Sequence, residues 1–129
     1  MEYLTELLDL ICELVETNCN LDSKILLEEL PSEDGLYAEL GEGITENTYF
    51  DKSTTKIIPI IFQSCSTDQK RGIEQLCSIC NYLQSLRKYP QGNSFSWLTT
   101  TVAKEPKKIS KDENGMYVYS CVLNCRIYY

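Results

Sequence analysis

Cysteines are the residues whose spacing in this sequence most resembles a chemical site. Cys77 and Cys80 form a Cys-x-x-Cys pair, and Cys121 and Cys125 lie four residues apart near the end of the chain. Four thiolates at such spacings can bind zinc tetrahedrally. Both pairs, however, fall on apolar faces of the elements predicted below, and free cysteine is among the most buried residue types. We therefore expect the four thiols to pack in the core and to bind neither a metal nor a cofactor.

Catalysis has few candidate residues in this chain. There is no histidine, the commonest general base at neutral pH and the usual partner of a serine or cysteine nucleophile. Gly41 and Gly43 are followed by Ile44 and Thr45, without the lysine that a phosphate-binding loop requires. The nineteen Asp and Glu residues offer many carboxylate pairs, and no pair is singled out by its spacing. The sequence therefore favours a protein that is not an enzyme.

Length and composition fit one folded domain over residues 1–129. Hydrophobic residues make up 43% of the chain and charged residues 24%, which is ordinary for a globular protein. The apolar runs are too short to cross a bilayer, and Glu2 and Glu6 stand where a secretory signal carries basic residues. We expect no membrane association, and we expect the seven cysteines to be free thiols in a reducing compartment.

The two halves of the chain carry opposite charge. Residues 1–51 hold fourteen acids and only Lys24 as a base, a net charge of −13, whereas residues 52–129 have a net charge of +6. If the two sets lie on different faces of the fold, one copy attracts the opposite face of the next, and such head-to-tail contacts can close into a ring. Alternatively, both sets are solvated and partly neutralise each other within one molecule.

The first predicted element is an amphipathic helix over residues 3–17. Its apolar residues recur at three- and four-residue spacings: Leu4, Leu7, Leu8, Ile11, Leu14 and Val15. The other face carries five acids and no base: Glu2, Glu6, Asp9, Glu13 and Glu16. Because these acids repel one another, packing or a partner surface must hold the helix in place. Glu6 and Glu13 are therefore candidate interface residues.

Two strands are predicted before the middle of the chain. The weak signals between residues 18 and 46 favour a short turn of helix near residues 23–29 and a strand near residues 36–40. The run of β-branched residues over 54–64 predicts a longer, central strand. Pro59 cannot donate a hydrogen bond to a ladder, so this strand is expected to lie at an edge or to bulge there.

A second helix is predicted after that strand. Thr67 and Asp68 offer N-cap chemistry, and the helix is expected to run to about Lys88 before Pro90 and Gly92 end it. Its apolar stripe is Ile73, Leu76, Cys77, Cys80, Leu83 and Leu86. Amphipathic helices of this kind pack on a sheet.

A long hairpin is predicted at the end of the chain, with strands over residues 94–104 and 115–129. Four lysines lie near or in the connection, so the hairpin has a basic tip: Lys104, Lys107, Lys108 and Lys111. Lysines can contact phosphate, but a sequence pI of about 4.6 argues against a nucleic-acid binder. We expect a solvated loop or a contact with an acidic protein neighbour, and no specific nucleic-acid binding.

The last strand has two different faces. Its odd positions are apolar and should pack under the helices: Tyr117, Tyr119, Cys121, Leu123, Cys125, Ile127 and Tyr129. Its even positions become polar toward the end, and Asn124, Arg126 and Tyr128 are candidates for contact with another subunit. Replacing Arg126 with Glu is expected to weaken such assembly and leave the fold intact. The fold class is thus α+β: a mainly antiparallel sheet of about four strands, packed against two amphipathic helices, with a long C-terminal β-hairpin.

The order of these elements resembles a family of small phage proteins. The specific part of the resemblance lies in residues 55–69 and 115–129, where the chain ends Tyr-x-Tyr-x-Cys-x-Leu-x-Cys-Arg-Ile-Tyr-Tyr. The family comprises minor capsid or tail-terminator proteins of long-tailed phages, often encoded in prophages of Gram-positive bacteria. The resemblance implies a structural virion protein, assembled in the host cytoplasm, that forms a hexameric ring on the tail tube and joins it to head-completion or connector proteins. It implies no catalysis.

The sequence also allows a second interpretation, in which the protein is an inhibitor and not a structural component of a virion. The acidic half of the chain could mimic nucleic acid and block a DNA-processing protein, as a small acidic inhibitor. In the ring, by contrast, some of these acids could line a lumen through which DNA passes without being held.

Overall fold

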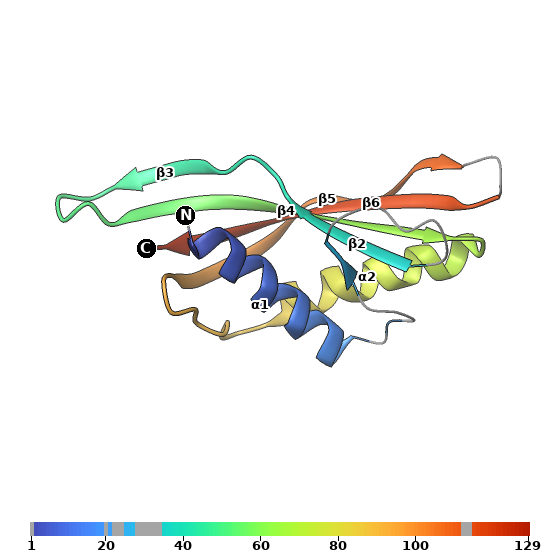
Figure 1. Ribbon diagram of the computed structural model, residues 1–129, viewed down its shortest axis with the longest axis horizontal. Helices are drawn as coiled ribbons and strands as arrows, with labels where there is room; N and C mark the ends of the chain where they lie inside the picture. The colour runs from blue at the N-terminus through green and yellow to red at the C-terminus, as the bar shows by residue number, and fades with distance from the viewer. Residues whose placement is uncertain (1, 20, 22–24, 28–34, 112–114) are drawn as a thin grey trace.

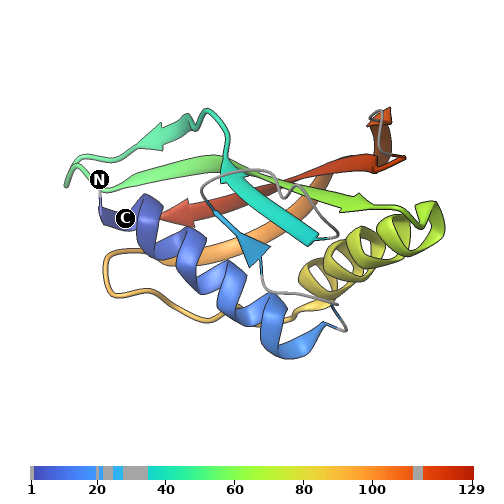
Figure 2. The same cartoon turned by 45° about the vertical axis from the view of Figure 1, so that its right-hand side comes forward.

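The structure is a computed structural model, and it describes residues 2–19, 21, 25–27, 35–111 and 115–129. Over these residues the chain forms two helices, α1 (Glu2–Asn18) and α2 (Gln69–Ser85), together with a six-stranded sheet. The strands are β1 (Ile25–Leu26), β2 (Gly35–Leu40), β3 (Ile44–Thr48), β4 (Thr54–Ser66), β5 (Ser96–Lys111) and β6 (Tyr117–Tyr128). Figure 1 and Figure 2 show both helices on the same side of the sheet. The predicted α+β class, with a C-terminal hairpin, is confirmed.

The centre of the sheet is the long antiparallel ladder between β4 and β6. It runs without a register shift from the pair Thr55 and Tyr128 to the pair Ser66 and Tyr117. The strand order is β1-β2-β4-β6-β5, and β3 pairs with β4 beside β2. Only the short β1–β2 pair is parallel among the described residues. The four strands predicted from the sequence are present, and β1 and β3 are additional to them.

Pro59 lies inside the sheet, so the prediction of an edge strand or a bulge at this residue was wrong. The Pro59 carbonyl accepts a hydrogen bond from the Gly41 N–H at 2.8 Å, and the missing Pro59 donor faces the same side. On that side β2 ends at Leu40 and β3 begins only at Ile44. The position where Pro59 lacks an N–H therefore faces the gap between β2 and β3, where neither strand requires that hydrogen-bond donor.

The hydrophobic core lies between the helices and the sheet. The sheet contributes alternate residues of β4 and β6: Ile58, Ile60, Phe62, Cys121, Leu123, Cys125 and Ile127. The prediction that Cys121 and Cys125 point into the core is confirmed, since both are fully buried. Not all of the opposite face is open, because Met116 and Val118 are buried with Cys65 in a second, smaller cluster.

The buried faces of the helices differ slightly from the predicted apolar stripes. In α1 the fully buried residues are Leu7, Ile11 and Val15, one helical turn apart. In α2 the buried face includes Ile79, which was not in the predicted stripe, whereas Cys77 is only half-buried. The stripe is thus rotated slightly from the one that the sequence suggested.

The second helix ends at Ser85, three residues before the predicted Lys88. Leu86 has extended backbone angles, φ −66° and ψ 129°, and closes the helix. The chain then turns back, so that the Tyr89 hydroxyl donates a hydrogen bond to the Leu83 carbonyl at 2.8 Å. This bond satisfies one of the carbonyls that a helix end leaves without a backbone partner.

Two further predictions need correction. Ile25 and Leu26 form strand β1, not the turn of helix predicted near residues 23–29, and the rest of that segment apart from Leu27 lies outside the described residues. Strand β5 extends to Lys111, so the four lysines assigned to a hairpin tip lie along a strand. The β5 ladder with β6 continues as far as Lys111 and Tyr117, which explains why these residues are extended.

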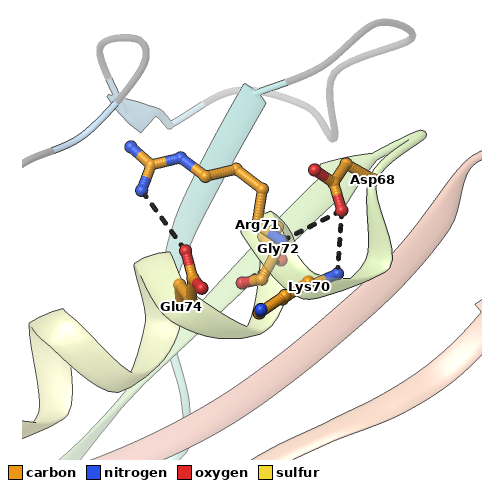
Figure 3. Close-up of polar contacts among 6 residues, drawn as sticks. Asp68, Lys70, Arg71, Gly72 and Glu74 are labelled. Atoms are coloured by element: carbon orange, nitrogen blue, oxygen red, sulfur yellow. Dashed lines mark hydrogen bonds and ion pairs between the residues drawn. The ribbon is translucent and has the colours of Figure 1, made fainter.

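The start of α2 is fixed by the predicted cap, as Figure 3 shows. The Asp68 carboxylate accepts hydrogen bonds from the N–H groups of Lys70 at 3.1 Å and Arg71 at 3.4 Å. One turn further, the Ser64 hydroxyl of β4 donates to the Gly72 carbonyl at 3.2 Å. A Cβ at Gly72 would stand 3.3 Å from that hydroxyl, so the glycine allows the helix to approach the sheet closely.

Removing this cap should destabilise the fold without changing its surfaces. We expect Asp68→Ala to lower the free energy of unfolding by about 1 kcal/mol, because two helix N–H groups lose their acceptor. Asp68→Asn keeps an acceptor oxygen and should cost clearly less. Urea unfolding of the three proteins measures the difference, and equal losses in both variants would contradict the role given to the cap.

Candidate assembly surfaces

The basic residues occupy the outer edge of the sheet. Within the described chain β5 pairs only with β6, and its ladder has four register shifts. Pro106 and the lysines Lys104, Lys107, Lys108 and Lys111 lie in its second half. Bulges, proline and lysine all discourage another strand from pairing with an edge. This edge is therefore suited to contacts through side chains and poorly suited to backbone pairing.

The four lysines have different surroundings. The ammonium groups of Lys108 and Lys111 lie 5.8 and 5.1 Å from the centre of the Tyr117 ring, within the range of a cation–π contact. Lys104 and Lys107 form no ion pair with another described residue. Both line a hollow of about 810 Å³ on the sheet face that the helices leave uncovered, as does Lys108, but neither lies over the Tyr117 ring. Lys104 and Lys107 are thus the lysines most available to a partner.

That hollow, which we call the sheet groove, crosses β2, β4, β6 and β5. The middle of the groove is formed by Ile61 of β4, Val122 of β6 and Ile109 of β5. Its polar lining includes the acids Glu39 and Glu105 as well as Gln63 and the lysines. The side chains of Ile61 and Val122 are half-buried, and that of Ile109 is 53% exposed. The groove therefore offers apolar surface beside lysines.

The polar end of β6 is only partly free for a partner. Asn124 is half-buried, whereas Arg126 and Tyr128 are exposed, as the alternation predicted. The Arg126 guanidinium forms an ion pair of 2.6 Å with Glu46 of β3. The Tyr128 ring lies 6.2 Å from that of Tyr49. Both side chains thus hold β3 and its turn against β6, a role that the sequence did not suggest.

The acids of α1 also divide into two kinds. Glu13 is exposed, and it shares a shallow hollow of about 290 Å³ with Asp9. Glu6 instead binds within the chain, because its carboxylate accepts hydrogen bonds from the Asn93 N–H, the Ser94 N–H at 3.4 Å and the Ser94 hydroxyl at 2.8 Å. The Ser94 hydroxyl most strongly, and then the two N–H groups, hold the pKa of Glu6 below its ordinary 4.5 against the opposing effect of burial. Glu6 is therefore a structural residue in this chain.

A hairpin that the sequence analysis missed projects from the sheet. Strand β3 has only exposed residues, and with the start of β4 it extends past the helices at one end of the molecule (Figure 1). Its turn carries Tyr49 and Phe50, which are 49% and 109% exposed. The sequence signal was present as a polar and aromatic turn, Tyr-Phe-Asp-Lys-Ser, between two β-branched segments.

A tyrosine and lysine cluster joins the two ends of the chain near this hairpin. Lys56 donates a hydrogen bond to the Tyr3 hydroxyl at 2.9 Å, and Tyr3 donates to the Tyr129 hydroxyl at 3.2 Å. The two rings stack with their centres 4.2 Å apart. The hydrogen bond to Tyr3 raises the pKa of Lys56, so the cation is favoured in the folded chain. The cluster anchors α1 to the last strand.

Cys121 and Cys125, which the zinc hypothesis would bring to one site with Cys77 and Cys80, have different neighbours. The Cys121 thiol contacts Cys80 across the α2–β6 interface, and its hydrogen bond to Cys80, together with burial, raises the pKa of Cys121. Cys125 instead lies 3.9 Å from the Thr100 hydroxyl, and burial raises its pKa to about 12. In the part of the chain that the structure describes, no three His, Cys, Asp or Glu residues are grouped as a metal site would require.

The fold and these surfaces define a class: a small α+β protein with helices on one face of its sheet and a polar, grooved face on the other. The family model described as bacteriophage tail terminator protein matches residues 15–129. The chain therefore belongs to the bacteriophage tail terminator family, which has a structural role in assembly of the virion tail. No curated protein matches the chain. Neither helix that the structure describes is long and apolar enough to cross a membrane.

The Glu6 contact predicts a pH-dependent stability. We expect Glu6→Gln to lower the melting temperature by a few degrees at pH 7, because the charged acceptor of the Asn93 and Ser94 donors is lost. A folded pKa below 4.5 means that the stabilisation is complete above pH 4.5 and is lost as the pH falls through the folded pKa. Thermal unfolding from pH 7 to pH 3 should show the two proteins converging. A constant difference across this range would contradict the charge contribution.

Proposed function

We propose that this protein ends the tail tube as a hexameric ring of identical copies and joins the tube to the head-completion or connector proteins. In this role it is a minor structural component of the virion neck, assembled in the bacterial host cytoplasm, and it catalyses no reaction. The family assignment gives the tail terminator class, and the ring, its copy number and its neighbours are proposed here in addition.

One observation carries the proposal: opposite charges stand on different parts of the molecule. The exposed acids Asp9, Glu13 and Glu16 lie on the middle and second half of α1, which runs from the end where the hairpin of β3 projects to the middle of the molecule, on the helix side of the sheet (Figure 1). The lysines lie on the half of β5 that runs toward the other end (Figure 1). A contact between such different surfaces is heterologous, and it forms a closed ring when the rotation between copies permits.

The same charges bear on the passage of DNA. Acids of the first half that no neighbour covers would repel phosphate if they faced a central lumen. A lumen of this kind would let DNA pass without holding it. Several of those acids, among them Glu28, Glu29, Glu33 and Asp34, lie outside the described residues.

Charge reversal on β5 tests the contact. We expect Lys104→Glu combined with Lys107→Glu to weaken self-association about tenfold or more, because the acidic surface would then meet acids. Light scattering after size-exclusion chromatography, and co-sedimentation with purified tail tubes, measure the association at low and high salt. The tail tubes are included because binding to the tube can drive copies to associate that stay apart in free solution.

A matched control separates the local effect from net charge. Arg87→Glu combined with Lys88→Glu changes the net charge by the same amount at exposed positions outside the proposed contact. This control should associate like the unmodified protein. If both double variants lose association equally, β5 is not the contact surface, and if the unmodified protein stays monomeric even on tubes, the ring itself is refuted.

Arg126 requires a separate test because it has a partner within the chain. Arg126→Glu should weaken association, but it also places two acids, Glu46 and the new residue, side by side. Combining Arg126→Glu with Glu46→Arg restores the ion pair with its charges exchanged. Recovery of association in the combined variant means that Arg126 acts by holding β3. Persistent loss at unchanged melting temperature means that Arg126 contacts the neighbouring copy, as the sequence predicted.

A further inference from the structure

Exposed apolar side chains concentrate on the hairpin of residues 44–57, which we call the arm. Ile44 is 64% exposed, Tyr49 is 49% exposed and Phe50 is fully exposed. Tyr128, which faces the arm from β6, is 37% exposed. Large apolar groups gathered in this way mark an interaction surface more often than isolated ones do.

The turn of the arm holds Phe50 in a defined position. The Lys52 N–H donates to the Tyr49 carbonyl at 2.9 Å, and the Tyr49 N–H donates to the Ser53 carbonyl at 2.9 Å. Lys52 has a φ of 69°, the left-handed conformation that closes a three-residue hairpin loop. The Asp51 carboxylate accepts from the Ser53 hydroxyl at 2.6 Å. Phe50 therefore stands at the corner of an ordered turn, next to a carboxylate.

The arm is also fixed at its base. The Arg126–Glu46 ion pair joins it to β6, and the Tyr49 hydroxyl lies 3.4 Å from that of Thr55. The Lys56–Tyr3 hydrogen bond ties its other strand to α1. These contacts pre-organise the arm, which reduces the entropy lost when its tip is bound.

The sheet groove has the features that this tip needs. Ile61 and Val122 supply apolar surface that a phenyl ring can cover. Three lysines line the groove, Lys104, Lys107 and Lys108, against the two acids Glu39 and Glu105, so the groove carries an excess of positive charge that suits a carboxylate. The groove and the arm lie on different segments of β4. The arm strand β3 pairs with residues 54–57, whereas residues 61 and 63 line the groove. The two surfaces are thus separate, as a head-to-tail contact between copies requires.

We propose that the arm of one copy docks in the sheet groove of the next, with Phe50 against Ile61 and Val122. The Asp51 carboxylate then lies beside Lys104 and Lys107. This inference rests on the self-association proposed above and assigns it a specific contact. Aromatic anchors buried at the centre of an interface commonly supply most of its binding energy, so Phe50 is its principal residue.

Photo-crosslinking from the arm tests the contact directly. Phe50 is replaced by p-benzoylphenylalanine, and this protein is mixed with isotope-labelled unmodified protein on tail tubes before illumination. We expect crosslinks between copies to peptides that contain Ile61, residues 104–109 or residues 120–122. If the copies associate but the crosslinks fall elsewhere, on the chain or on the tube protein, the docking is overturned and the ring is not. If the copies do not associate, both proposals fail.

Substitutions at the tip test its energetics. Phe50→Ala should weaken association about tenfold or more. The melting temperature should not change, because the fully exposed phenyl group of Phe50 makes no core contact. Asp51→Asn keeps an acceptor for Ser53 and should weaken association less while reducing its salt dependence. Leu98→Ala, at a residue 44% exposed outside the arm and the groove, is the control and should have no effect. Equal losses in Phe50→Ala and Leu98→Ala would refute a specific anchor.

Discussion

Pro59, in the middle of strand β4, is the constraint on which the layout of the molecule depends. β4 spans the sheet and pairs with β6 along twelve residues, so its other side could have held one equally long partner. Proline removes one donor on that side, and the partner is divided into β2 and β3 at this residue. Gly41 fits the interval because a Cβ there would lie 3.1 Å from the Pro59 ring. The division leaves β3 free to form the projecting arm.

The periodic parts of the sequence predicted the fold well, because burial on one face leaves a regular pattern. The alternation along residues 117–129 identified the buried face of β6, and the spacing in residues 3–17 identified α1 to within a residue at each end. Asp68 was recognisable as a cap because its role depends only on local sequence. Burial of Cys121 and Cys125 followed from the same alternation.

Features that depend on tertiary pairing could not be predicted in this way. β3 has no buried residue, so it carries no alternation, and only its pairing with β4 makes it a strand. The lysines of β5 read as a loop because they are polar, and they are extended because β6 lies beside them. Glu6 looked like an interface acid, since nothing local shows that the distant Ser94 lies against it. For the candidate surfaces, the sequence identified the charged residues, but it did not show which side chains within the same chain they contact.

The outer edge of β5 explains why side chains, and not backbone, are expected to join the copies at this side of the sheet. An unprotected edge would add strands indefinitely and produce fibres, which a protein that ends a structure must avoid. β5 is protected by its bulges, Pro106 and lysines, and the same lysines stand beside the sheet groove. In the proposed ring, one set of residues thus both discourages unlimited strand pairing and takes part in a limited contact between copies. If the arm docks as proposed, neutralising Lys104 and Lys107 weakens both the protection of the β5 edge and the contact between copies, whereas changing Phe50 affects the contact alone.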